Sequence, residues 1–149
     1  MEISEALSLI DRLQNLPDLY DRVEAAVCGV VHRYYDELFE VEKIEAEIID
    51  SVGFDDERLP VLLKKKSAIH EKYWSNKSSY YKPCSAGNTP DHVWNSLAAI
   101  EILQNGDDEN SLYIFKAKKL RGDGSLGVSV SFILKLVDNQ LFIEHEFFG

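Results

Sequence analysis

The stretch that decides the fold is residues 128–148, which read VSVSFILKLVDNQLFIEHEFF. Apolar side chains fall on every second position from Val128 to Leu136, and only a pleated strand places alternate positions on opposite faces. Asp138-Asn139-Gln140 then supplies residues that tolerate a left-handed backbone, which predicts a turn. A second alternating run follows, and its predicted inward side chains are Leu141, Ile143, His145 and Phe147. The stretch therefore predicts two antiparallel strands.

Two further strands are predicted upstream. Residues 112–120 alternate in the same way and lead into the glycine-rich hairpin loop 121–125. Residues 93–103 fit both a helix and a strand, but the turn signal Asn105-Gly106 favours a strand at about 97–104. A sheet so rich in aromatic and β-branched residues needs a cover on one face, and the first half of the chain is the expected cover.

That first half predicts helices. Apolar residues at helical spacing predict one helix at about 4–15, and Pro17-Asp18 begins a longer helix that ends at Gly53. The apolar stripe of the longer helix is Tyr20, Val23, Val27, Val30 or Val31, Tyr34 and Leu38, followed by Val41, Ile44, Ile48 and Val52. Because the stripe changes phase near Glu40, the sequence predicts either a kink there or two helices in succession.

A third helix is predicted after Gly53. Asp55 or Asp56 would cap its start, and Pro60 would lie in its first turn. Its predicted buried stripe is Leu59, Leu62, Leu63, Ile69 and Tyr73. The run Lys64-Lys65-Lys66 is assigned to the solvated side of this helix, which is the usual place of a short charge run.

Helices followed by strands predict an α+β fold, with N-terminal helices packed on a curved antiparallel sheet. We expect a single domain over residues 1–149. Its helices are expected at about 4–74, an irregular loop at about 75–92 and the sheet at about 93–148.

The chain is acidic, with a net charge of −10. Residues 1–58 carry 16 acidic and 5 basic side chains, whereas residues 59–90 carry 1 acidic and 6 basic ones. An acidic surface repels phosphate backbones, so nucleic acid is not an expected ligand. The same surface would attract a basic protein, and it also serves solubility.

The sequence predicts a cytoplasmic protein. No apolar run approaches the ~20 residues that span a bilayer, and the acidic start Met1-Glu2-Ile3-Ser4-Glu5 lacks the pattern of a signal peptide. No membrane partner is therefore expected, and Cys28 and Cys84 are expected to be free thiols.

Motifs of catalysis are absent from the sequence: it contains no Walker loop, no HExxH and no nucleophile elbow. The histidines His32, His70, His92 and His145 lack the spacing of metal ligands. We therefore expect no enzyme activity, no metal and no cofactor. His145 is the one inward candidate for a general base, although a hydrogen-bonded structural histidine is the commoner role at a sheet face.

The candidate partner-binding residues are acidic side chains, which attract cations, and tyrosines, which often anchor interfaces. They are Asp55, Asp56, Glu57, Tyr80, Tyr81, Asp107, Asp108, Glu109, Glu144 and Glu146. Glu144 and Glu146 are expected on the face opposite His145, as a surface pair. Local roles stay open, because the first acidic triplet also suits a helix start and the tyrosines could close the end of the core.

One segment carries a resemblance to a known family. Residues 70–77, HEKYWSNK, followed by Tyr80-Tyr81-Lys82-Pro83, resemble bacterial immunity proteins of the nuclear-transport-factor-2-like superfamily. In that family a helix ends in a Tyr–small/Cys–Thr–x–Lys pattern, and a Tyr-Gly-x-Pro-like turn precedes the sheet. Trp74 and Ser75 stand here at the Cys and Thr positions. The resemblance covers about residue 20 to the end of the chain.

The resemblance implies a cone-shaped sheet and a cytoplasmic protein that neutralises a cognate bacterial toxin by stoichiometric binding. The toxin domain would have a basic surface. Two other functions stay open. The same fold resembles that of isomerases and hydrolases, which implies a pocket enzyme or a small-ligand binder. A homodimer could also form through the outer sheet face, where Phe142 and Phe148 would be exposed.

Overall fold

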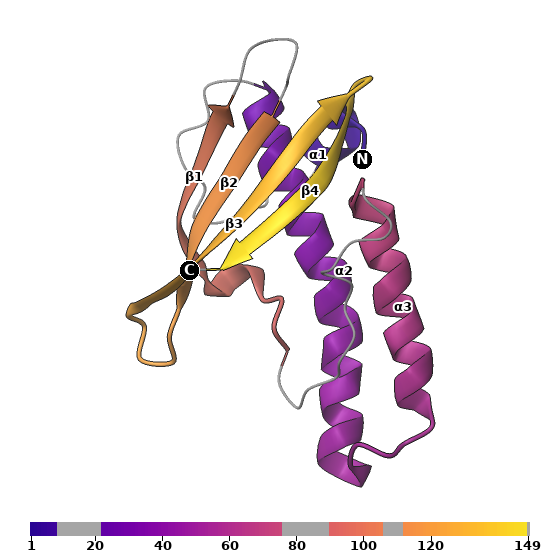
Figure 1. The fold of residues 1–149 in the computed structure, drawn as a ribbon. Helices are drawn as coiled ribbons and strands as arrows, with labels where there is room; N and C mark the ends of the chain where they lie inside the picture. The colour runs from indigo at the N-terminus through magenta and orange to yellow at the C-terminus, as the bar shows by residue number, and fades with distance from the viewer. Residues whose placement is uncertain (9–21, 76–89, 106–111, 149) are drawn as a thin grey trace. The chain divides into compact units, whose positions relative to one another are not determined.

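Figure 1 shows the fold in a computed structural model, which describes residues 1–8, 22–75, 90–105 and 112–148. The described chain has the predicted α+β composition. Its helices are α1 (Ile3–Leu7), α2 (Arg22–Val52), α3 (Arg58–Tyr73) and the 3-10 helix η2 (Trp94–Ser96). Its strands are β1 (Leu97–Asn105), β2 (Leu112–Leu120), β3 (Leu126–Val137) and β4 (Gln140–Phe148).

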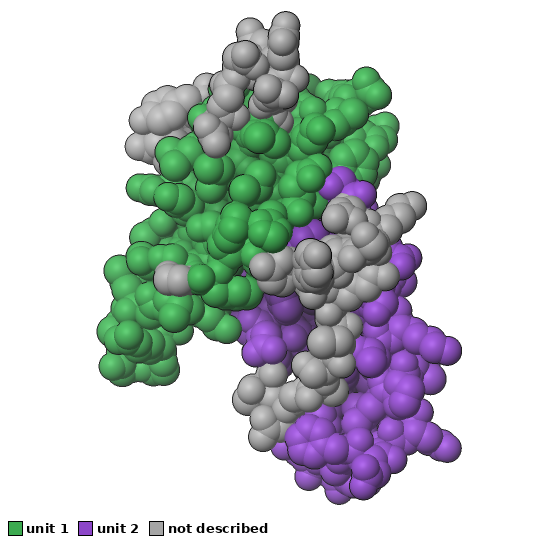
Figure 2. Space-filling model, in the orientation of Figure 1, with its two compact units in different colours: residues 1–33, 95–149 green, residues 34–94 purple. Residues whose placement is uncertain are grey.

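The chain divides into two compact units, drawn in different colours in Figure 2. Unit 1 comprises residues 1–33 and 95–149, and unit 2 comprises residues 34–94. Unit 1 therefore contains the sheet with α1 and the start of α2. Unit 2 contains the rest of α2 together with α3.

The strands of unit 1 form one curved antiparallel sheet in the order β1-β2-β3-β4, so that every neighbour in space is also a neighbour in sequence (Figure 1). The alternation predicted for β2 and β3 is confirmed. The buried positions are Tyr113, Phe115 and Ala117 on β2, and Val130, Phe132 and Leu134 on β3. Directly opposed residues such as Phe115 and Phe132 point to the same side, and their rings meet edge to face at 6.1 Å.

Two of the three predicted turns are confirmed, and the third, at Asn105-Gly106, extends outside the described residues. Asp138 and Asn139 adopt left-handed φ values of 50° and 64°, as a two-residue turn between twisted strands requires. In the loop 121–125, the amide of Arg121 donates to the carbonyl of Ser125 at 2.8 Å. Local turn chemistry thus fixes the register of the neighbouring strands.

The register of β4 differs from a plain alternation. Leu134 is opposite Ile143, but the preceding residue Ile133 is opposite His145, so Glu144 is the extra residue of a β-bulge. Each residue of β4 after the bulge therefore points to the face of the sheet opposite to the one that plain alternation predicts. Glu146 consequently lies opposite Phe132, on the side of the core, and is only 6% exposed.

The prediction that His145 and Phe147 point inward is therefore wrong. His145 shares the outer face with Ile133, and Phe147 lies opposite Ser131 on that same face. The centroids of the His145 and Phe147 rings lie 4.4 Å apart, and the two rings are nearly perpendicular. The prediction that Glu144 and Glu146 form a surface carboxylate pair is also wrong, because the bulge buries Glu146.

Short segments of unit 1 close around the beginning of β4. Glu2 forms an antiparallel bridge with Gln140, and the amide of Leu141 donates to the carbonyl of Met1 at 2.8 Å. Helix α1 then lies against α2 at Gly29, where an added Cβ would stand only 1.9 Å from the carbonyl oxygen of Ala6. The predicted first helix beyond residue 8, and Pro17 and Tyr20 of the second, lie outside the described residues.

The long helix α2 is one continuous helix of 31 residues, so the predicted alternative of two helices in succession is wrong, and the predicted kink near Glu40 stays a prediction. It ends as predicted at Gly53, which has φ 91° and whose amide donates to the carbonyl of Ile49 at 3.0 Å. The predicted stripe is wrong at Ile44 and Val52, which are 44% and 59% exposed.

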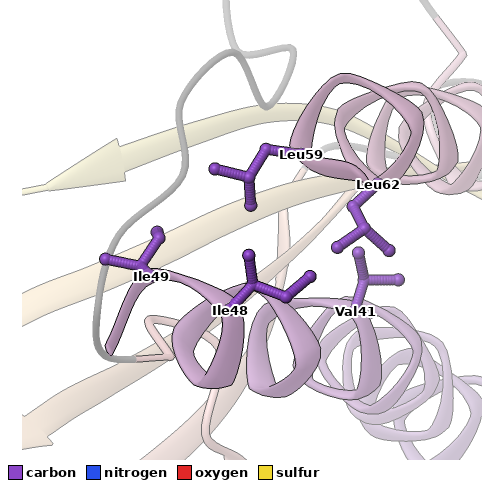
Figure 3. Close-up of a cluster of buried hydrophobic side chains, with 5 residues drawn as sticks. All are labelled: Val41, Ile48, Ile49, Leu59 and Leu62. Atoms are coloured by element: carbon purple, nitrogen blue, oxygen red, sulfur yellow. The ribbon is translucent and has the colours of Figure 1, made fainter. Parts of the chain in front are cut away.

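Helices α2 and α3 form a hairpin whose apolar cluster is shown in Figure 3. The cluster consists of Val41, Ile48, Ile49, Leu59 and Leu62, with Ile69 packed against it. Asp56 holds the start of α3, because its Oδ1 accepts a hydrogen bond from the amide of Arg58 at 2.9 Å and its carboxylate pairs with the Arg58 guanidinium. These contacts lower the pKa of Asp56 to about 2. The N-cap of α3 is Glu57, which makes no side-chain capping hydrogen bond, so the prediction that Asp55 or Asp56 caps this helix is wrong.

Candidate functional site

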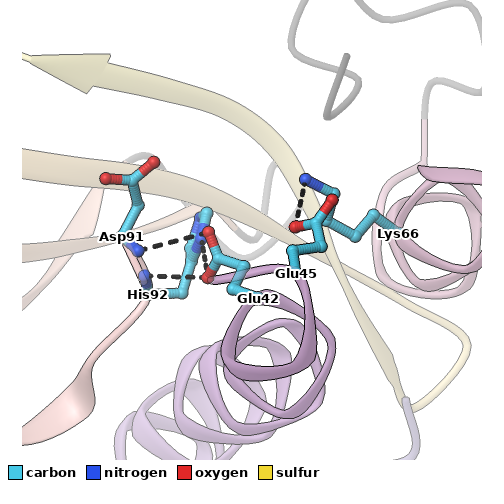
Figure 4. Close-up of polar contacts among 5 residues, drawn as sticks. All are labelled: Glu42, Glu45, Lys66, Asp91 and His92. Atoms are coloured by element: carbon cyan, nitrogen blue, oxygen red, sulfur yellow. Dashed lines mark hydrogen bonds and ion pairs between the residues drawn. The ribbon is translucent and has the colours of Figure 1, made fainter. Parts of the chain in front are cut away.

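A buried ion pair joins α2 to α3 within unit 2. Lys66 Nζ lies 2.8 Å from Glu45 Oε1, and the two side chains are 4% and 1% exposed (Figure 4). The assignment of Lys66 to the solvated side of α3 is therefore wrong, whereas Lys64 and Lys65 are exposed as predicted. A carboxylate and an ammonium that both leave water need each other, since either alone would carry a large desolvation penalty.

A second buried carboxylate, Glu42, lies one turn earlier on α2. It accepts hydrogen bonds from the amides of Asp91 and His92 at 3.2 and 3.0 Å, and His92 Nδ1 lies 3.0 Å from its Oε1 (Figure 4). The His92 ring also meets the rings of Tyr34 and Tyr35 edge to face, at 5.8 and 5.1 Å. These contacts fasten the segment before η2 to the middle of α2.

Opposing effects act on the pKa of Glu42. Burial raises it, but the hydrogen bonds from the side chain and amide of His92 and from the amide of Asp91 lower it, and the net pKa lies below its ordinary value of 4.5. A carboxyl group with a depressed folded pKa adds stability above the unfolded pKa and loses it as the pH falls through the folded pKa. Glu42 therefore helps to hold unit 2 together at neutral pH and releases that contribution in acid.

We expect Glu42→Gln to lower the free energy of unfolding at pH 7 by about 1.5–3 kcal/mol, the range for hydrogen bonds to a charged group. The amide keeps an acceptor but not the charge, so the stability of the variant should also fall less steeply between pH 5 and pH 3. Urea unfolding followed by circular dichroism at several pH values measures both effects. The matched control is Glu47→Gln, an exposed position on the same helix. Equal pH slopes for the two variants would contradict the assignment.

The end of the helical hairpin carries exposed apolar side chains, which we call the hairpin tip. Its apolar members are Ile44, Val52, Phe54 and Val61, which are 44%, 59%, 67% and 57% exposed. Its acidic members, all exposed, are Glu47, Asp50, Asp55 and Glu57. A groove of about 560 Å³ runs between the two helices at this end. Its apolar lining residues are Ile44, Ile48, Val61 and Leu62, and its charged lining residues are Glu47, Arg58 and Lys65. An apolar groove with charged neighbours is a surface on which another protein can dock.

The structure brings only some of the predicted partner-binding residues together. Asp55 and Glu57 are exposed at the hairpin tip, and Asp56 is half-buried beside Arg58. Glu144 is half-buried at the bulge of β4, in the other unit. The predictions for Tyr80, Tyr81, Asp107, Asp108 and Glu109 fall on residues outside the described part of the chain.

Sequence reasoning missed the buried polar residues Glu42, Glu45 and Lys66. A signal for them was present. Glu45 lies four residues after Val41 and three before Ile48, in phase with the apolar stripe, and helix residues so spaced share one face. Because Glu45 occupies a position of the apolar stripe, the pattern indicated that its carboxylate is buried and that Ile44 is not.

Cys28 of α2 is buried, and burial together with the nearby carboxylate of Glu24 raises the pKa of its thiol to about 12. The thiol is therefore protonated at neutral pH and unsuited to nucleophilic chemistry. Cys84 lies outside the described residues.

No family model, curated protein or solved structure matches this chain. Within residues 1–8, 22–75, 90–105 and 112–148, three or more His, Cys, Asp or Glu side chains are nowhere grouped so that they could hold a metal ion. Among the helices described above, none is both long and apolar enough to cross a membrane.

Proposed function

We propose that this protein is an immunity protein, which binds a cognate bacterial toxin in the cytoplasm and neutralises it by stoichiometric protein–protein binding. Its fold would be the cone-shaped one of the nuclear-transport-factor-2-like superfamily. The observation that carries the proposal is the hairpin tip, where exposed apolar side chains lie beside exposed carboxylates.

The tip has the two features of a protein-binding surface. Phe54 and Val61 offer apolar area whose burial contributes about 25 cal/mol per Å². The surrounding carboxylates supply charge that steers a basic partner and fixes its orientation. Asp56 contributes less to such attraction, because the Arg58 guanidinium already neutralises it. We therefore infer a partner surface with an apolar anchor surrounded by Lys or Arg.

The contact between Glu42 and His92 favours a second candidate, a pocket enzyme or small-ligand binder. A carboxylate that orients a histidine is half of a general-base arrangement. Against this second function, the Glu42 carboxylate already accepts hydrogen bonds from the backbone amides of residues 91 and 92. The other buried carboxylate, Glu45, is engaged by Lys66. Binding of a protein partner is the better supported function.

The direct test uses the C-terminal domain of a toxin whose gene would neighbour the gene of this protein. The two proteins are mixed at increasing ratios, and complex formation is followed by size-exclusion chromatography while toxin activity is assayed in parallel. We expect a stable complex and loss of activity at one equivalent. A toxin that stays fully active in the presence of excess protein would refute the proposal.

Substitutions at the hairpin tip test where the partner binds. We expect Phe54→Ala and Val61→Ala each to weaken toxin binding about tenfold or more, as loss of an interface anchor does. Asp55→Lys should mainly slow association and reduce its dependence on salt. Calorimetry and surface plasmon resonance give the affinities and rates.

The matched control for these variants is Val128→Ala, a valine of β3 that is 53% exposed in unit 1. Its affinity should stay within about twofold of the original protein, because the substitution removes the same kind of exposed apolar area elsewhere. If Phe54→Ala and Val61→Ala bind as tightly as the control, the hairpin tip is not the interface, even where neutralisation itself is observed.

A further inference from the structure

A second site lies on the outer face of the sheet, in unit 1. There a hollow of about 330 Å³ is lined by Lys116, Lys118, Ser129 and Ser131, with Ala99 and Glu101 at its side. The register places Lys116 opposite Ser131 and Lys118 opposite Ser129, on the side of the sheet away from the buried rings of Phe115 and Phe132. Two ammonium groups and two hydroxyl groups thus form neighbouring rows on adjacent strands.

The hollow owes its shape to an irregularity of β1. The pairing of β1 with β2 shifts between Ala98 and Glu101, and Ala99 between them has φ 52°. A left-handed backbone costs an alanine about 1–2 kcal/mol, since its Cβ approaches the following carbonyl oxygen. The small side chain of Ala99 leaves space beside Lys116 and Lys118, and strain of this kind is concentrated where a protein binds something.

The donor set suits an anion. Lys118 Nζ donates to Ser129 Oγ at 2.5 Å, which leaves the hydroxyl proton of Ser129 available to a ligand. Glu101 is opposite Lys116 and offsets one of the two positive charges, so the hollow retains a net positive charge on a chain of net charge −10. All five basic residues after position 91 lie between residues 116 and 135.

The chemistry narrows the class of anion. Lysines bind phosphate as point charges, and the serine hydroxyls beside them can donate to further phosphate oxygens. A hollow of about 330 Å³ lies at the small end of small-molecule sites and is larger than phosphate alone needs. The Glu101 carboxylate would repel a second phosphate but can accept hydrogen bonds from hydroxyl groups.

We propose that this hollow binds a small phosphate monoester that carries hydroxyl groups, with the phosphate on Lys116, Lys118 and the two serine hydroxyls, and the hydroxyl groups towards Glu101. The site is independent of the hairpin tip and of toxin binding. The site differs from a nucleic-acid site, because a single phosphate group uses all four donors: the two lysine ammonium groups and the two serine hydroxyls.

The test is a titration of the full-length protein at low ionic strength with ribose 5-phosphate, inorganic phosphate and ribose, followed by calorimetry and by amide NMR shifts. We expect ribose 5-phosphate to bind about tenfold more tightly than inorganic phosphate and ribose to show no saturable binding, since the ester uses both parts of the site. Amide shifts should be confined to β1, β2 and β3.

Two variants make the test specific. Lys116→Gln and Lys118→Gln should each weaken binding of ribose 5-phosphate about tenfold, the loss of one charge-assisted hydrogen bond. Lys135→Gln, an exposed lysine of β3 opposite Phe142, is the matched control and should change affinity less than about twofold. Equal binding by all three variants would overturn the site, and equal affinity for inorganic phosphate and the ester would overturn the proposed ligand class.

Discussion

Lys66→Met is expected to lower the free energy of unfolding by about 3–5 kcal/mol, the cost of leaving one partner of a buried ion pair without the other. Methionine fills nearly the same volume, so the loss is electrostatic rather than a cavity. The Glu45 carboxylate would keep its burial and lose the ammonium that lies 2.8 Å from it. Urea unfolding at pH 7, monitored by far-UV circular dichroism, measures the effect.

The double variant Glu45→Leu, Lys66→Met distinguishes the electrostatic contribution of the ion pair from the contribution of side-chain packing. Replacing both charges by apolar side chains removes the desolvation penalty together with the attraction, so we expect stability close to that of the original protein. Lys65→Met, on the exposed side of the same helix, is the control and should change stability by less than about 0.5 kcal/mol. A Lys66→Met effect as small as that of Lys65→Met would show that the Lys66 ammonium reaches water.

Gly29→Ala is expected to destabilise the protein by about 1–3 kcal/mol, as inserting a methyl group into a packed interior does. The sign is informative, because the same substitution in an exposed helix would stabilise it by about 1 kcal/mol. The new Cβ would lie 1.9 Å from the carbonyl oxygen of Ala6, and a backbone oxygen cannot move unless α1 moves with it. Thermal and urea unfolding report the change.

Removal of residues 1–8 provides the decisive comparison for Gly29. Without α1 the clash is gone, and Gly29→Ala should then stabilise the shortened chain. Gly53→Ala is a second reference, since its cost arises from φ 91° with no atom within 4 Å of the added Cβ. That cost should be the same with and without residues 1–8. Identical effects of Gly29→Ala in both backgrounds would refute the close packing of α1 on α2.

Local patterns predicted the sheet well. The bounds of residues 112–120 and the turn at Asp138-Asn139 are confirmed, because alternation and turn chemistry depend on residues close in sequence. The bulge at Glu144 could not be predicted in this way, since it arises from the fit of two strands. One extra residue then reversed the predicted orientations of His145 and Glu146.

The helix errors have a similar origin. Apolar spacing alone placed Ile44 inside, whereas the face of α2 that is buried against α3 carries Glu45, which pairs with Lys66. The candidate site was predicted only at Asp55 and Glu57, whose acidic side chains are exposed at a local turn. Its apolar members Phe54 and Val61 could not be predicted as a surface, because they come together only when α2 and α3 pair. The periodicity within each helix carries no information about that pairing.

The division of the chain has a consequence for its synthesis. Unit 2 is continuous in sequence, whereas unit 1 is split, with its second part beginning at residue 95. On a ribosome, the whole α2–α3 hairpin is translated before the first strand, and domains generally fold as units in the order of their synthesis. The segment that we propose meets the toxin can thus take shape while the sheet that completes the molecule is still being made.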